Sequence, residues 1–166
     1  MFTHMSSPWP PPPPLIGALL RVPSHAIHRR IIAGLIDAGF DELRLPHIAV
    51  FQFPGPEGVS PGALAERAGI SKQAMNQLLR TLESSGYIAR FDHGEDARAT
   101  VVEFTKRGRA AYAKMAEILQ DIEREWASEL GSRPFAELKS LLGRVWQSPL
   151  SGVEPLGAGS KNTRRR

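Results

Sequence analysis

One stretch of the chain, residues 60–105, constrains the fold more than any other, because two helix starts and a strand pair follow one another in it. A short helix is expected over residues 60–68, since Ser60 supplies a capping hydroxyl and a proline follows it at the first helical position. Gly69-Ile70 predicts a tight turn. A longer helix is then expected over residues 71–85, capped by its first serine and ended by a glycine suited to left-handed backbone.

Two strand-like segments follow that helix. Residues 87–92 and 98–105 are rich in β-forming residues, and His93-Gly94-Glu95-Asp96 between them is typical of a hairpin turn. The order short helix, turn, longer helix and hairpin predicts a winged helix-turn-helix. The expected fold class is therefore mainly α with a small β-hairpin wing (α+β).

The rest of the chain is expected to be helical, except at its two ends. Apolar residues recur at helical spacing over residues 15–38, with Pro23-Ser24 as a start or a kink, and again over residues 42–51. A helix of about 25 residues should follow Thr105, and a last one should follow Pro134. This divides the chain into a disordered proline-rich leader (1–14), N-terminal helices for dimerisation and a possible effector pocket (15–57), the winged helix-turn-helix (58–105), C-terminal dimerisation helices (106–148) and a disordered basic tail (149–166).

Bulk charge does not by itself indicate nucleic-acid binding. The net charge is +4, but Lys161 and the last three arginines lie in the tail, and without them 17 basic residues balance 17 acidic ones. Any attraction to phosphate must therefore depend on where the charges lie. The proline run at residues 10–14 is compatible with a docking peptide, although a semi-rigid leader is the simpler interpretation.

The helix over residues 71–85 has two different faces. At about 100° per residue, its methionine and leucines fall on one side and predict a contact with the core. Amides and cations fall on the other side, and such side chains pair well with base edges in the major groove. A solvated surface face also collects these residue types, but it commonly pairs them with glutamates, which are absent here until Glu83.

These segments resemble the MarR (multiple antibiotic resistance regulator) family of winged helix-turn-helix regulators. Residues 71–80, followed by Leu82-Glu83 and Gly86-Tyr87-Ile88, are similar to that family's recognition helix and wing entry. Asp96-Ala97-Arg98, then five residues and Phe104-Thr105, is similar to its wing motif, and Lys106-Arg107-Gly108 to the start of its next helix.

The resemblance implies a DNA interface. Arg98, held by Asp96, would reach the minor groove or its phosphates, while Ser60 and Ser71 would bring backbone N–H groups close to phosphate. Arg90 and His93 would offset the wing's acidic residues. The family often has arginine where Ala97 stands, so this wing carries one cation fewer. The major-groove residues would be Lys72, Gln73, Asn76, Gln77 and Arg80.

Other sites have weaker support. In similar proteins the first, second and fifth helices surround a small-molecule pocket, which His25, Arg29, His47 and Phe51 could line here. Capping and interface packing are equally good explanations for them. His25 and His28 could share a metal, but no carboxylate stands at suitable spacing, so no metal or cofactor is expected. The chain has no cysteine, no phosphate-binding glycine loop and no nucleophile elbow, and we expect no enzyme and no catalytic residue.

We therefore expect a cytoplasmic, homodimeric, sequence-specific regulator that binds a palindromic operator in double-stranded DNA and has no membrane segment. It is expected to be a repressor released by a small-molecule effector. The alternative is a MarR-like scaffold that has lost operator binding and serves as a small-molecule-binding protein, an enzyme or an adaptor.

Overall fold

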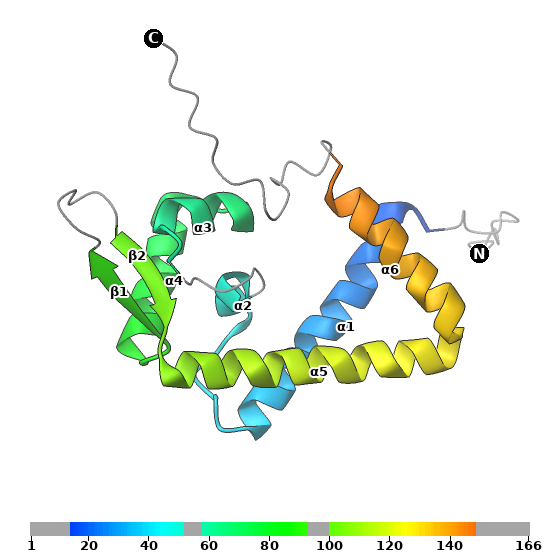
Figure 1. The fold of residues 1–166 in the computed structure, drawn as a ribbon, viewed down its shortest axis with the longest axis horizontal. Helices are drawn as coiled ribbons and strands as arrows, with labels where there is room; N and C mark the ends of the chain where they lie inside the picture. The colour runs from blue at the N-terminus through cyan, green and yellow to red at the C-terminus, as the bar shows by residue number, and fades with distance from the viewer. Residues whose placement is uncertain (1–13, 52–57, 93–99, 149–166) are drawn as a thin grey trace, which may run out of the picture.

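The fold is described here from a computed structural model, for residues 14–51, 58–92 and 100–148. It consists of six helices and one hairpin in these ranges (Figure 1): α1 (Ile16–Asp37), α2 (Leu45–Phe51), α3 (Pro61–Ala68), α4 (Lys72–Ser84), β1 (Ile88–Asp92), β2 (Thr100–Phe104), α5 (Lys106–Leu130) and α6 (Ser132–Trp146). The expected class, mainly α with a β-hairpin wing, is confirmed.

The hairpin is the only sheet within the described ranges. β1 and β2 pair antiparallel, from Ile88 opposite Phe104 to Asp92 opposite Thr100. A single bridge between Val59 and Val102 ties the segment before α3 to β2. We call α2, α3, α4 and the hairpin the winged region; they gather at one end of α5 in Figure 1. The predicted turn at residues 93–96 lies outside the described residues, as do the leader (residues 1–13) and the tail (149–166).

One apolar core joins the winged region to the middle of the long helices. Leu35 of α1, Phe51 of α2, Met75 of α4 and Ile122 of α5 all belong to it, and each is almost fully buried. Gly34 lies against Ile118, because a Cβ at residue 34 would stand 2.6 Å from the Cδ1 atom of that isoleucine. The α1–α5 contact is therefore close.

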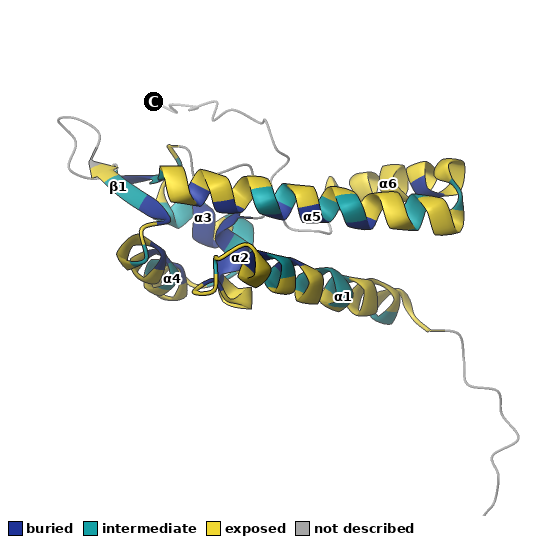
Figure 2. Cartoon of the chain, turned by 90° about the horizontal axis from the view of Figure 1, so that it is seen from below, coloured by how far each residue is buried: buried dark blue, intermediate teal, exposed yellow. Residues whose placement is uncertain are grey.

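The far ends of the long helices are built differently. We call residues 16–22 of α1 and 138–146 of α6 the arms; both lie at the end of α5 away from the winged region (Figure 1). Figure 2 shows long exposed faces on both. The exposed apolar side chains of the arms are Ile16, Leu19, Leu20, Val22, Leu138, Leu141, Leu142, Val145 and Trp146.

α1 begins at Ile16, close to the expected start of the helical pattern, and runs through Pro23, so that this proline does not start the helix. Two other expected helix starts were wrong. α2 begins at Leu45 and not at residue 42, because a helix from 42 would need a backbone N–H at Pro46, which proline lacks. α6 begins at Ser132, so that Pro134 falls in the first turn, where no N–H is needed. Within the described residues, no helix has the length and apolarity to cross a membrane.

Candidate nucleic-acid interface

The helix-turn-helix is fixed by local capping. The Ser60 hydroxyl accepts a hydrogen bond from the Ala63 N–H (3.2 Å), and the Ser71 hydroxyl accepts one from the Ala74 N–H (3.1 Å). Gly69 ends α3 with φ 64°, a left-handed conformation that favours glycine. These are the caps and the turn that the sequence predicted. They leave the two N-terminal turns at the surface.

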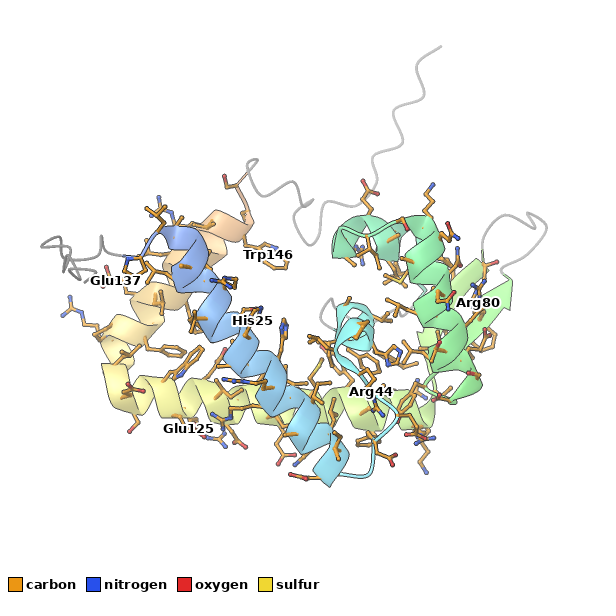
Figure 3. The ribbon with its side chains drawn as sticks, turned by 180° about the vertical axis from the view of Figure 1, so that it is seen from behind. His25, Arg44, Arg80, Glu125, Glu137 and Trp146 are labelled. Atoms are coloured by element: carbon orange, nitrogen blue, oxygen red, sulfur yellow. The ribbon has the colours of Figure 1, made fainter. Side chains whose placement is uncertain are left out.

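α4 buries one face and exposes the other. Met75, Leu79 and Leu82 are almost fully buried against the core. On the opposite side Lys72, Gln73, Gln77 and Arg80 are exposed, and Asn76 is half-buried. An Arg80 Nη2 group donates to the Gln77 Oε1 atom at 3.3 Å, so these two side chains are already oriented together. Figure 3 shows Arg80 projecting from α4 to the outside of the winged region.

The base of the wing contributes less free charge than the sequence suggested. The Arg90 Nε atom lies 3.1 Å from the Glu83 Oε2 atom, and only 22% of the arginine side chain is exposed. Glu83 thus engages a cation that had been assigned to DNA. His93, Asp96 and Arg98 lie outside the described residues.

A polar cluster at the end of α4 was missed by the sequence analysis. Both Glu42 oxygens accept hydrogen bonds from the Arg107 Nη2 group at 2.8 Å, and the Tyr87 hydroxyl donates to Glu42 Oε2 at 3.0 Å. The hydrogen bonds from Arg107 hold the pKa of the Glu42 carboxyl down, at about 2. Burial raises the pKa of the Tyr87 hydroxyl to about 12. No local pattern marks this cluster, because Glu42 and Arg107 are 65 residues apart.

A pocket of about 600 Å³ opens on α1 beside the first residue of α2. His25 and Arg29, both predicted for an effector site, line it, and His28 joins them; its other lining residues are Ile32, Ala33, Ile36 and Leu45. Figure 3 shows His25 on the side of α1 that faces the winged region.

The other two predicted effector residues, His47 and Phe51, are buried in α2 and do not line this pocket. His47 Nδ1 instead accepts the Arg44 backbone N–H (3.1 Å), and burial lowers the pKa of this imidazole. Among the residues that the structure describes, no three His, Asp or Glu side chains gather as a metal site would require.

The described elements define a winged helix-turn-helix protein: α3 and α4 joined by a tight turn, a following hairpin, and long flanking helices. A family model described as "MarR family" matches residues 52–99. The HTH-type transcriptional repressor Rv2887 of Mycobacterium tuberculosis is 30% identical over 88 residues, which are 53% of this chain and 63% of the repressor. The chain therefore matches somewhat less than two thirds of that relative's length.

Solved structures agree over most of the chain. Rv2887 in complex with salicylic acid superposes with a TM-score of 0.61 at 26% identity, covering 81% of this chain and 98% of that one. The reduced form of MarR from E. coli gives 0.66 at 21% identity, covering 80% and 97%. CouR bound to a 23-mer DNA duplex gives 0.64 at 19% identity, covering 79% and 92%. The chain is thus similar to MarR family proteins in sequence over residues 52–99 and in fold over most of the described residues.

Proposed function

We propose that this protein is a cytoplasmic, dimeric, sequence-specific DNA-binding regulator, acting as a repressor that a small-molecule effector releases. The observation that carries the proposal is the surface of α4. Its apolar face is buried in the core, while a face rich in amides and cations is exposed on the outside of the winged region. Glu83, the only acidic residue of α4, forms an ion pair with Arg90. The face is therefore suited to an anionic duplex.

The amides on this face argue for base recognition. Lysine and arginine gain affinity from phosphates on any duplex, whereas a neutral amide contributes mainly where it meets a base edge. Gln73 and Asn76 are the amides proposed to pair with adenine. Backbone N–H groups after Ser60 and Ser71 are proposed to meet phosphate. Asp96, Arg98, Arg90 and His93 remain the proposed wing residues.

The arms support a homodimer. They expose apolar side chains from two helices, α1 and α6, at the surface of the described part of the chain. A second copy is the occupant that offers an equally apolar face by symmetry. A symmetric dimer would present two α4 helices to a palindromic operator, with the half-sites about one helical turn, or 34–36 Å, apart.

The pocket on α1 supports an effector. Its walls are mostly aliphatic, and His25, His28 and Arg29 at its rim are suited to the carboxylate of a small organic acid. Rv2887 was crystallised with salicylic acid, which makes salicylate a suitable first probe. Its addition should weaken operator binding by the wild type, and an Arg29→Ala variant should require more salicylate for the same effect.

The test of base recognition is competition binding at fixed salt, using the DNA beside the protein's own gene and a scrambled duplex. Asn76→Ala and Gln73→Ala should each lower the preference for the cognate duplex about ten- to a hundredfold, since one bidentate pair is worth about 1–3 kcal/mol. Binding to the scrambled duplex should change little. Gln120→Ala removes an exposed amide from α5 and is the matched control. Equal losses on both duplexes would assign the amides to the DNA backbone, and no loss would favour a scaffold that no longer binds an operator.

A further inference from the structure

Three segments that are distant in sequence meet at the guanidinium of Arg107, in the first turn of α5. It donates to both oxygens of Glu42 in the α1–α2 connection, and its Nη1 group donates to the Ser85 carbonyl at the end of α4 (3.1 Å). Its Cζ atom lies 4.6 Å from the centre of the Tyr87 ring, so the cation also stacks on the aromatic face. One side chain therefore connects α1–α2, α4 and α5.

Further hydrogen bonds join the end of α4 to the start of α5. Beside the bond to Ser85, the Gly86 carbonyl accepts from the Thr105 hydroxyl (2.6 Å), and the Tyr87 carbonyl accepts from the Thr105 N–H (3.1 Å). All of these donors lie at the start of α5. Tyr87 itself is fully buried, with its ring 6.3 Å from that of Phe40 and 6.4 Å from that of Phe51. The residues that directly follow α4 are thus held by groups at the start of α5.

A second arginine–glutamate pair provides a comparison, because it has the same residue types as Glu42–Arg107 but lies elsewhere in the fold. Arg30 of α1 and Glu125 of α5 form a second pair, in which Nη1 and Nη2 each donate to one oxygen, at 2.5 and 2.7 Å. Both pairs are about half-exposed. Arg30–Glu125, however, joins α1 to α5, whereas Arg107 of the Glu42 pair also donates to the carbonyl of Ser85, the residue that follows α4.

We infer that Glu42 is a positioning residue: through Arg107 and Tyr87 it fixes the recognition helix α4 relative to α5, and thereby sets the half-site spacing that the dimer accepts. This inference rests on the proposed function, because spacing matters only to a dimer on an operator. The α1–α2 connection that carries Glu42 runs from the end of α1 to Leu45, and Ile36 and Leu45 on either side of it line the pocket. A ligand there would lie beside the backbone that holds Glu42.

The experiment measures affinity for duplexes in which the two half-sites are moved apart or together by one base pair. For the wild type, either change should lower affinity at least tenfold relative to the best spacing. Glu42→Gln loses the charged pair and should tolerate both changes within about threefold. Arg107→Lys keeps the charge but loses the guanidinium that reaches Glu42 and the Ser85 carbonyl together, and should broaden the spacing profile in the same way. Glu125→Gln makes the same change of charge in the other pair and should keep the wild-type profile.

The profiles are compared after each variant is normalised to its own best duplex, so that a general loss of stability or affinity does not imitate the effect. A Glu42→Gln profile as narrow as that of the wild type would overturn the inference. A broadened Glu125→Gln profile would also overturn it, since loss of any ion pair between α1 and α5 would then have the same effect on spacing. Failure of the wild type to bind any of the duplexes would instead count against the proposed function.

Hydrogen exchange tests the same claim without DNA. The Tyr87 N–H donates to the Leu82 carbonyl (2.8 Å) and the Thr105 N–H donates to the Tyr87 carbonyl. Both amides should exchange at least threefold faster in Glu42→Gln than in the wild type, and at the wild-type rate in Glu125→Gln. Unchanged exchange at both amides in Glu42→Gln would overturn the inference whatever the protein does with DNA.

Discussion

The winged region and the arms both contain leucine, isoleucine and valine, but the winged region buries these side chains and the arms expose them. In the winged region Leu64, Leu79 and Val102 are at most 1% exposed. In the arms Leu141 is 48% exposed and Ile16 is 69% exposed. Because apolar surface in water costs about 25 cal/mol per Å², the exposed arms carry a free-energy cost that the buried side chains of the winged region do not, which is why we propose that a second copy covers them.

The difference teaches where folding and assembly are encoded. The winged region buries its apolar residues in a core that it shares with α1 and α5, and the polar face of α4 remains outside that core. The arms are helical, but their apolar stripe stays exposed in the part of the chain that the structure describes. We therefore expect disruptive substitutions in the winged region to unfold the protein, and those in the arms to dissociate the proposed dimer.

The largest effect is expected from charges placed on the arms. Leu138→Glu together with Leu141→Glu should give a particle of 18.2 kDa in light scattering, where the wild type gives twice that mass. Affinity for a palindromic operator should fall about a hundredfold or more, because the second half-site would no longer benefit from linkage. Far-ultraviolet circular dichroism should keep its helical signal, since both leucines are exposed.

The control for this pair is Leu79→Ala in the winged core. It should cost about 2–5 kcal/mol of unfolding free energy while the folded fraction stays dimeric. Ile118 and Ile122 are unsuitable for testing dimerisation, because both are buried in the chain's own core. A double-glutamate variant that remained a dimer would remove the contrast between the two regions.

Next in size is Gly108→Ala. A Cβ at this position would lie 1.9 Å from the Tyr87 carbonyl oxygen, so α5 and the wing entry cannot both keep their places. We expect a loss of about 3 kcal/mol, at the upper end for an overpacked site, measured by urea unfolding. Gly62→Ala, in the first turn of α3 with no contact under 3.9 Å, is the matched control and should be neutral or slightly stabilising. Equal effects at the two glycines would contradict the close approach.

A smaller effect should appear on acidification. The pKa of Glu42 is about 2 in the folded protein against an ordinary value of 4.5. A depressed carboxyl pKa means that the unfolded state binds more protons, so its contribution to stability is complete above pH 4.5 and is lost as pH falls towards 2. The wild type should therefore exceed Glu42→Gln in stability at pH 7, and the gap should close over that interval. A gap independent of pH would show that the carboxylate charge does not stabilise the fold.

The smallest effect is expected at His47. Its pKa is lowered by burial from an ordinary 6.5, and its Nδ1 atom can accept the Arg44 N–H only while unprotonated. The unfolded state binds the proton first, so stability should fall as pH drops below about 6.5. His47→Asn does not titrate and should show a flatter dependence in urea unfolding between pH 7.5 and 5.5. If the stability of the variant fell as steeply with pH as that of the wild type, a group other than His47 would be responsible for the dependence.

Features fixed by residues close in sequence were predictable, and those fixed across the chain were not. The caps at Ser60, Ser71 and Thr105 each join groups three residues apart, and they gave the helix starts of the winged region correctly. The start of α2 was missed because the effect of Pro46 was not weighed against a hydrophobic pattern that begins earlier.

The site shows the same division. The two faces of α4 follow from helical periodicity, and the burial of Met75 and Leu79 confirms the predicted core face. The engagement of Arg90 by Glu83 needs the strand to fold back beside the helix, which no local pattern reveals. No local pattern marks Glu42 for the same reason. Tyr87 and Arg107 carried a signal only as parts of the family-like wing entry and of the family-like start of α5.

Because α5 is long, a small change in the contacts at one of its ends would produce a large displacement at the other. With 25 residues at about 1.5 Å each, it is a rod of roughly 37 Å, with the arms at one end and the wing at the other. A tilt of only about 5° at the arm end would swing the wing end by about 3 Å, close to the roughly 3.4 Å rise of one base pair. A change of angle at the arms that is too small to disturb the packing of the core would therefore move the wing by about one base pair along the DNA.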